Sequence, residues 1–189
     1  MAERRRRLAP WVALAVAAVL AAFFIVLASA KSETNTDSAD TPLIGKPAPA
    51  MSGTTLDGQP WVLSRRKGSW VVLNFFNSTC VPCRNEHPEL VKFAAEQKKI
   101  NDGGEMITVV NDDTDGAVNA FFEKNGGDWP KVRDPDGTIA VAFGVAKVPE
   151  TWVIDPSGFV RMRIAGETTA SFLSTRLQAM RDMYNGVGS

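Results

Sequence analysis

The chain of 189 residues carries 21 basic and 21 acidic side chains, so its formal net charge is zero. This balance gives no electrostatic argument for a nucleic-acid partner, and the sequence lacks a basic patch interleaved with aromatic residues. The length and a hydrophobic fraction of 44% predict one globular domain with a sizeable core, preceded by a tail.

The first 30 residues combine a basic stub with an apolar run. Arg4 to Arg7 are consecutive arginines, and residues 11–30 contain no charge, which matches the roughly 20 residues that a helix needs to span a bilayer. Arginines on the short N-terminal side favour the cytoplasm, so the rest of the chain is expected outside it. The alternative is a signal peptide cleaved after Ala28-Ser29-Ala30, which would leave a secreted or periplasmic protein. A retained single-pass anchor in a bacterial cell membrane is preferred, because the apolar run is longer than a signal core.

Residues 31–41 are rich in Ser, Thr and Asp and hold no large apolar side chain. This composition predicts a flexible linker, followed by one domain over residues 42–189. Within that domain, residues 51–55 and 61–63 are short strand candidates. Asp57-Gly58 lies between them and predicts a β-hairpin.

Two cysteines follow the most apolar strand candidate. Residues 70–76 form a continuous apolar run, which predicts a buried strand. Cys80 and Cys83 then stand in a C-x-x-C spacing at the first turn of a helix predicted to reach about Ile100, which indicates a thiol–disulfide redox site. Unpaired N–H groups at a helix start stabilise a thiolate. We therefore expect Cys80 to attack and Cys83 to resolve the mixed disulfide.

Other roles for this cysteine pair are weaker. A structural zinc site needs about four ligands, and His87 is the one histidine in the chain. Haem attachment needs C-x-x-C-H, but Arg84 follows Cys83. An inert structural disulfide stays open, although closing so short a loop stabilises little. Residues 111–115 cluster carboxylates, but their spacing fits a helix cap better than calcium, so no metal site is expected.

The remaining elements alternate strands and helices. His87-Pro88 is expected to bend or restart the cysteine helix, and His87 is expected to be structural rather than catalytic. Further strands are predicted at residues 105–110 and 159–164, and further helices at residues 117–125, 138–143 and 170–184.

Two segments carry a family resemblance. V-V-L-N-F-F-N-S-T-C-V-P-C-R-N-E-H-P at residues 71–88 and G-V-A-K-V-P-E-T-W-V-I-D-P-S-G at residues 144–158 resemble the thioredoxin superfamily, in particular its membrane-anchored TlpA/ResA/DsbE-like branch. The resemblance covers about residue 42 to the C-terminus. It implies an α/β thioredoxin fold: a central mixed sheet flanked by helices, with an N-terminal β-hairpin and a family insertion that includes the helix at residues 117–125.

The resemblance also implies roles for particular residues. Ordinary thioredoxins carry a buried acid where this chain has Asn74, and Glu86 is implied to act on the cysteines in its place. Only about 5–6% of X-Pro bonds are cis, yet the resemblance implies a cis Pro149, with the backbone of Val148 offered to the substrate. Thr79 stands where most relatives have Trp, which leaves the choice of partner open.

The implied function is that of an extracytoplasmic thiol–disulfide oxidoreductase that reduces disulfides in cytochrome c maturation. It would need no cofactor beyond the redox-active Cys80–Cys83 pair. Its partners would be protein thiols or disulfides, such as apocytochrome c, and a membrane electron donor. The alternatives are general disulfide exchange in oxidative folding, a non-catalytic binding module, or a peroxiredoxin-type peroxidase. The pattern P-x-x-x-T-x-x-C of the last class fails at Leu73 and Asn77.

Overall fold

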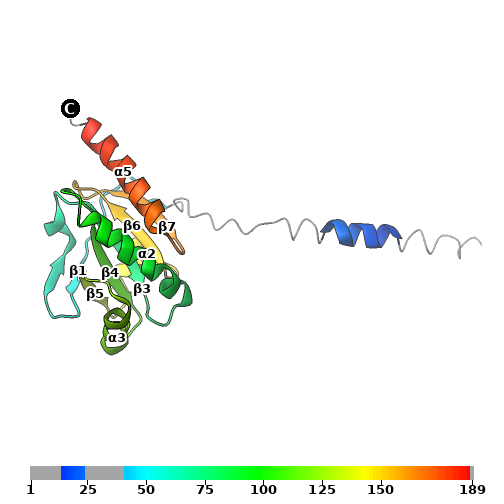
Figure 1. Ribbon diagram of the computed structural model, residues 1–189, viewed down its shortest axis with the longest axis horizontal. Coiled ribbons are helices and arrows are strands. Elements are labelled where there is room, and N and C mark those ends of the chain that lie inside the picture. The colour runs from blue at the N-terminus through cyan, green and yellow to red at the C-terminus, as the bar shows by residue number, and fades with distance from the viewer. Residues whose placement is uncertain (1–13, 24–40, 188–189) are drawn as a thin grey trace, which may run out of the picture. The chain divides into compact units, whose positions relative to one another are not determined.

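The computed structural model describes residues 14–23 and 41–187 (Figure 1). The chain divides into two units, Met1–Thr34 and Asn35–Ser189. In the first unit, residues 14–23 form a helix. Over the two described ranges, no helix is both long enough and apolar enough to cross a bilayer. Half of the predicted anchor at residues 11–30 and nearly all of the predicted linker lie outside the described residues, so both stay predictions.

The second unit is built on a five-stranded mixed sheet. Its strands are β3 (Val71–Phe76), β4 (Glu105–Asn111), β5 (Lys131–Asp134), β6 (Glu150–Ile154) and β7 (Val160–Ala165), in the spatial order β5-β4-β3-β6-β7. β3, β4 and β5 run parallel, whereas β6 is antiparallel to β3 and β7 is antiparallel to β6. Every residue of β3 is buried, as the continuous apolar run predicts for a central strand.

Helices cover both faces of this sheet. They are α2 (Val81–Gln97), α3 (Asp115–Asn125), α4 (Thr138–Phe143) and α5 (Ala170–Val187) (Figure 1). Alternate residues of β3 point to opposite faces: Val72 and Phe76 pack in the core with α2, α3 and α5, while Leu73 and Phe75 pack in a second core with α4. The thioredoxin-type α/β architecture expected from the sequence is confirmed.

A short hairpin precedes the sheet, as predicted. β1 (Ser52–Thr54) pairs with β2 (Pro60–Val62) in antiparallel fashion, and an isolated bridge joins Thr55 to Val132 of β5. Gly53 is required at this junction, because a Cβ there would lie 2.7 Å from Cγ1 of Val132.

Two local expectations need correction. The basic residues 64–69 predict a loop, but this segment begins within the 3-10 helix η1 (Leu63–Arg66). Of the bend or restart expected at His87-Pro88, the restart is wrong, because α2 continues through Pro88 to Gln97. A proline inside a helix costs about 3 kcal/mol. Leu90 and Phe93 are fully buried just beyond it, and burial of two such side chains contributes roughly 1.5–3 kcal/mol each, which is enough to hold the helix together.

Candidate active site

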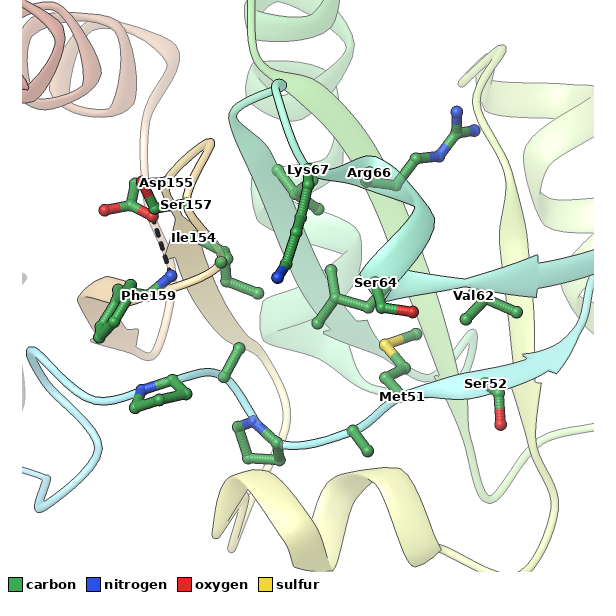
Figure 2. Close-up of a pocket in the computed structure, with 17 residues that line it drawn as sticks. Met51, Ser52, Val62, Ser64, Arg66, Lys67, Ile154, Asp155, Ser157 and Phe159 are labelled. Carbon is green, nitrogen blue, oxygen red and sulfur yellow. Dashed lines mark hydrogen bonds between the residues drawn. The ribbon is translucent and has the colours of Figure 1, made fainter. Parts of the chain in front are cut away.

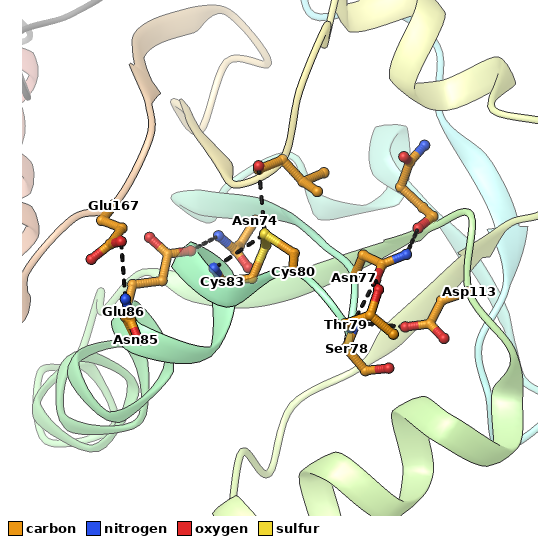
Figure 3. Close-up of a disulfide and its surroundings, with 12 residues drawn as sticks. Asn74, Asn77, Ser78, Thr79, Cys80, Cys83, Asn85, Glu86, Asp113 and Glu167 are labelled. Atoms are coloured by element: carbon orange, nitrogen blue, oxygen red, sulfur yellow. Dashed lines mark hydrogen bonds between the residues drawn. A yellow bond between two sulfur atoms is a disulfide. The ribbon is translucent and has the colours of Figure 1, made fainter.

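The two cysteines lie where β3 delivers the chain to α2. Cys80 is the N-cap residue of α2, and Cys83 lies in its first turn, with Pro82 between them at a position where a missing N–H costs nothing. The two form a disulfide with Cα atoms 5.3 Å apart (Figure 3). Cys83 is 0% exposed, whereas Cys80 is half-buried. A partner molecule therefore reaches the sulfur of Cys80 first.

The helix start is directed at Cys80. The backbone N–H of Cys83 donates a hydrogen bond of 3.3 Å to Sγ of Cys80. A donor at this place, together with the positive end of the helix dipole, stabilises a thiolate on Cys80 when the pair is reduced. The local geometry supports the assignment of Cys80 as the nucleophile, which was based on sequence.

Across from the disulfide lies a cis peptide bond between Val148 and Pro149. The cis geometry that the resemblance implied is thus present. Sγ of Cys80 lies 3.6 Å from the carbonyl oxygen of Val148 (Figure 3); in the reduced protein the thiol can donate to that oxygen. Pro149 is buried and Val148 is half-buried, so the segment just before β6 forms one wall beside the reactive sulfur.

Glu86 is buried one turn after Cys83 and is 2% exposed. Its Oε1 accepts a hydrogen bond of 2.8 Å from Nδ2 of Asn74, and its Oε2 accepts one of 3.0 Å from the backbone N–H of Thr168. Burial raises the pKa of Glu86 to about 8, against the lowering effect of these two donors. A carboxyl group with such a pKa can take up or return a proton near neutral pH.

Asn74 links Glu86 to the sheet. Its Nδ2 also donates a hydrogen bond of 3.1 Å to Oγ1 of Thr151 on β6. Its Oδ1 is buried without a hydrogen-bond partner. In Figure 3 the amide of Asn74 lies between the carboxyl group of Glu86 and the disulfide. A buried unpaired acceptor costs about 1–3 kcal/mol, so Oδ1 of Asn74 is destabilising while Nδ2 of the same amide holds Glu86.

The carboxylate of Glu150, next to Pro149, is paired with the half-buried guanidinium of Arg163. Nε and Nη2 of Arg163 on β7 donate to Oε2 and Oε1 of Glu150, each at 2.8 Å, and the Arg163 guanidinium also lies 5.4 Å from the ring centroid of Trp152. The alternation of Arg161 and Arg163 with apolar residues predicts a solvated face for Arg163. Its side chain is instead only 16% exposed. The pairing was missed because it depends on the β6–β7 register.

His87 is buried in the aromatic core, which agrees with a structural role. It is 1% exposed and packs against the rings of Phe121 and Phe122, with centroid distances of 4.8 and 4.9 Å. Its Nε2 lies 3.0 Å from the carbonyl oxygen of Gly126, which ends α3. Burial lowers the pKa of His87, so the ring is neutral and its Nε2–H donates to that oxygen.

Two of the acidic residues after β4, Asp113 and Asp115, are paired with neighbouring groups. Asp115 pairs with Arg133 at 2.7 Å, and Asp113 accepts hydrogen bonds from the backbone N–H groups of Ser78 and Thr114. In the ranges 14–23 and 41–187, no group of three or more His, Cys, Asp or Glu side chains is arranged to hold a metal ion.

A cavity of about 520 Å³ lies at the other end of β3, near Val71. Met51, Ile154 and Phe159 contribute apolar walls, and Lys67 extends over it (Figure 2). None of the five residues assigned to the redox site lines it. This cavity is therefore separate from the cysteine pair.

Comparison with known proteins agrees with this geometry. A model of the AhpC/TSA family matches residues 44–163. The thiol-disulfide oxidoreductase ResA of Bacillus thuringiensis is 35% identical over 135 residues, covering 71% of this chain and 77% of ResA. The thiol:disulfide interchange protein HelX of Rhodobacter capsulatus is 31% identical over 154 residues, covering 80% and 84% of the two chains.

A solved structure of a similar protein has the same fold as this chain. The crystal structure of a thiol:disulfide interchange protein of the thioredoxin family from Chlorobium tepidum has a TM-score of 0.60 and 27% identity, covering 70% of this chain and 92% of that chain. The TlpA/ResA/DsbE-like resemblance of residues 71–88 and 144–158 is confirmed. This chain belongs to the AhpC/TSA family and, within it, to the thiol–disulfide oxidoreductases that include ResA and HelX.

Proposed function

We propose that the chain reduces protein disulfides outside the cytoplasm, in the maturation of cytochrome c. The observation that carries the proposal is the placement of Cys80, whose accessible sulfur lies at the start of α2 and 3.6 Å from the carbonyl oxygen of Val148, with Cys83 buried behind it. The similarity to ResA, HelX and a DsbE homologue from Paracoccus denitrificans supports a shared type of client.

The proposed reaction begins with the reduced dithiol. The Cys80 thiolate attacks one sulfur of a client disulfide, which forms a mixed disulfide and releases the first client thiolate. Cys83 then loses its proton and attacks the sulfur of Cys80, which releases the second client thiolate. Two electrons pass to the client, which becomes a dithiol, and the Cys80–Cys83 disulfide is formed. A dithiol donor in the membrane reverses this change and restores the reduced pair.

Glu86 is proposed to manage the proton of Cys83. The ionised form of Glu86, which is the minor form at pH 7 for a pKa of about 8, accepts that proton as Cys83 attacks, and the carboxyl group then holds it. The neutral Glu86 can return the proton when the disulfide is reduced again. Asn74, hydrogen-bonded to Oε1 of Glu86, orients the carboxyl group for this task.

The substrate is proposed to lie against Val148 and Pro149. The half-buried Val148 precedes β6, so its backbone N–H and C=O groups can pair with an extended client segment as a short strand. The apolar run at residues 11–30 is proposed to anchor the domain to a bacterial membrane, with residues 31–41 as the linker, which keeps the cysteines outside the cytoplasm.

The deciding experiment is the midpoint potential of the Cys80–Cys83 pair in the full chain, measured by thiol trapping in redox buffers. A reductant requires a value near or below the roughly −270 mV of thioredoxin. The reduced chain should also reduce an oxidised C-x-x-C-H peptide, the sequence to which haem is attached. A potential near the roughly −120 mV of DsbA would overturn the reductive role, and a pair that never exchanges would make the disulfide structural.

A further inference from the structure

The loop that delivers Cys80 is attached to a neighbouring loop. β3 and β4 are parallel, with Phe76 opposite Val110, so the segments that follow them leave the sheet side by side. The first is residues 77–80, before α2, and the second is residues 112–114, before α3. Side-chain hydrogen bonds from Asn77 and Asp113 connect the two segments (Figure 3).

Asn77 uses its whole amide group in this connection. Its Nδ2 donates to the carbonyl oxygens of Asn111 at 3.1 Å and Asp112 at 2.6 Å. Its Oδ1 accepts from the backbone N–H of Thr79 at 2.8 Å and from Oγ1 of Thr79 at 2.6 Å. The same side chain therefore fixes both the β4–α3 loop and the residue directly before Cys80.

Asp113 makes the return contact. Its Oδ2 accepts a hydrogen bond of 2.5 Å from the backbone N–H of Ser78, which is 7% exposed, and its Oδ1 accepts one of 2.7 Å from the N–H of Thr114. Asp112 has a φ of 48°, the one positive φ of a non-glycine residue in the described chain. Such a conformation costs about 1–3 kcal/mol and turns the Asp112 carbonyl oxygen toward Asn77.

We propose that Asn77 and Asp113 are positioning residues for the attacking cysteine. Together they hold Asn77, Ser78 and Thr79, and so they fix the place from which Cys80 presents its sulfur to the N–H of Cys83. A thiolate gains from a helix N-terminus only while it stays there, because the effect falls off within the first turn. Without this connection Cys80 moves out of that field and its thiolate is stabilised less.

The test is the rate of alkylation of the reduced full chain by iodoacetamide as a function of pH, with the modified cysteine identified by mass spectrometry. In Asn77→Ala and in Asp113→Ala we expect the thiol pKa of Cys80 to rise by about one unit, which lowers the thiolate fraction below that pKa about tenfold. Asn85→Ala, on the cysteine helix α2, is the matched control, since the Asn85 amide makes an exposed hydrogen bond to Glu167 in the segment before α5. Its thiol pKa should stay that of the unmodified chain.

The possible outcomes distinguish a role in positioning Cys80 from a role in the stability of the fold alone. If both variants unfold more easily yet keep the unmodified thiol pKa, the contacts are only structural and the proposal is overturned. A lower thiol pKa in Asp113→Ala would mean that the carboxylate acts by its charge, which also overturns it. Should Asn77→Ala fail to fold, Asp113→Ala, at a half-buried loop position, carries the test. The inference rests on Cys80 as the nucleophile. Alkylation of Cys83 in the unmodified chain would show that this assignment had failed instead.

Discussion

Nδ2 of Asn74 donates a hydrogen bond of 2.8 Å to Oε1 of Glu86, and both side chains are almost fully buried. The donor favours the ionised carboxylate, whereas burial favours the neutral acid. Burial is the larger effect, and it raises the pKa of Glu86 from its ordinary 4.5 to about 8. The resting oxidised protein therefore holds a buried proton three residues from Cys83 at neutral pH.

This proton makes stability depend on pH. Because the folded-state pKa of Glu86 is raised, the stability it contributes is complete below its ordinary pKa of 4.5 and is lost as the pH rises through about 8. Between pH 7 and pH 8 the free energy of unfolding of the oxidised chain should fall by about 1 kcal/mol, within the limit of about 1.4 kcal/mol per pH unit. Urea unfolding at each pH measures this change, and Glu86→Gln should abolish it.

The window from pH 7 to pH 8 is chosen so that titration of His87 does not contribute to the measured change in stability. The pKa of His87 is lowered from 6.5 by burial, so its effect has the opposite sign: its contribution is present above 6.5 and is lost as the pH falls. Above pH 7 that contribution is nearly constant. A slope that persists unchanged in Glu86→Gln would show that another group carries the buried proton.

Single replacements of the cysteines should separate their roles. Cys83→Ser leaves the nucleophile without a resolving thiol, so a mixed disulfide between Cys80 and an oxidised C-x-x-C-H peptide should accumulate. Cys80→Ser leaves only the 0% exposed Cys83 and should form no such adduct. Mass spectrometry under non-reducing conditions counts the adducts. Equal trapping by the two variants would contradict the assigned roles.

The ion pair beside Pro149 predicts a large cost for breaking it. Arg163→Met leaves Glu150 buried and without this partner, so the free energy of unfolding should fall by about 3–5 kcal/mol. The double variant Arg163→Met/Glu150→Met should recover much of that loss. Arg66→Met is the control: its pair with Glu105, at 3.3 Å, is about one-third exposed on both sides, and should cost about 1 kcal/mol or less. Equal losses for the two ion pairs would refute the buried role of Arg163.

Replacement of His87 is expected to lower the free energy of unfolding without changing the rate of disulfide reduction. His87→Ala empties a space among the rings of Phe76, Phe121, Phe122 and Trp129. It also leaves the Gly126 carbonyl oxygen without its donor. The free energy of unfolding should fall by about 3 kcal/mol, while the rate of peptide reduction at low temperature stays unchanged. A rate that falls while the chain is still fully folded would give His87 a catalytic part.

Much of the fold was predictable because its signals are local. The apolar run of β3, the Asp57-Gly58 turn and the amphipathic pattern of α5 each identify an element without knowledge of its neighbours. Pro88 shows the limit of local rules. Its cost is local, but Leu90 and Phe93 compensate for it by packing in the core that lies between α2 and the sheet.

Only part of the site could be predicted, because several of its contacts depend on how strands pair and not on local sequence. The spacing of Cys80 and Cys83 indicates their chemistry without a structure, whereas a role for Glu86 is implied only by family resemblance and stays a prediction. The contact from Asp113 to Ser78 depends on the parallel pairing of β3 and β4, across 35 residues of sequence. The pairing of Arg163 with Glu150 depends on the β6–β7 register. Neither leaves a pattern in the amino-acid order.

Two acidic side chains of α2 accept hydrogen bonds from the backbone at the start of the C-terminal helix α5. Oε2 of Glu86 accepts from the N–H of Thr168, and Oε2 of Glu89 accepts from the N–H of Ala170, at 3.0 and 2.9 Å. The segment entering α5 thereby presents a backbone donor to the carboxyl group that is proposed to serve the cysteines. A change in residues 166–169 that retracts this helix start would raise the pKa of Glu86 further, and so alter redox behaviour at a sequence distance of 82 residues. The C-terminal helix is, in this sense, an electrostatic component of the active site.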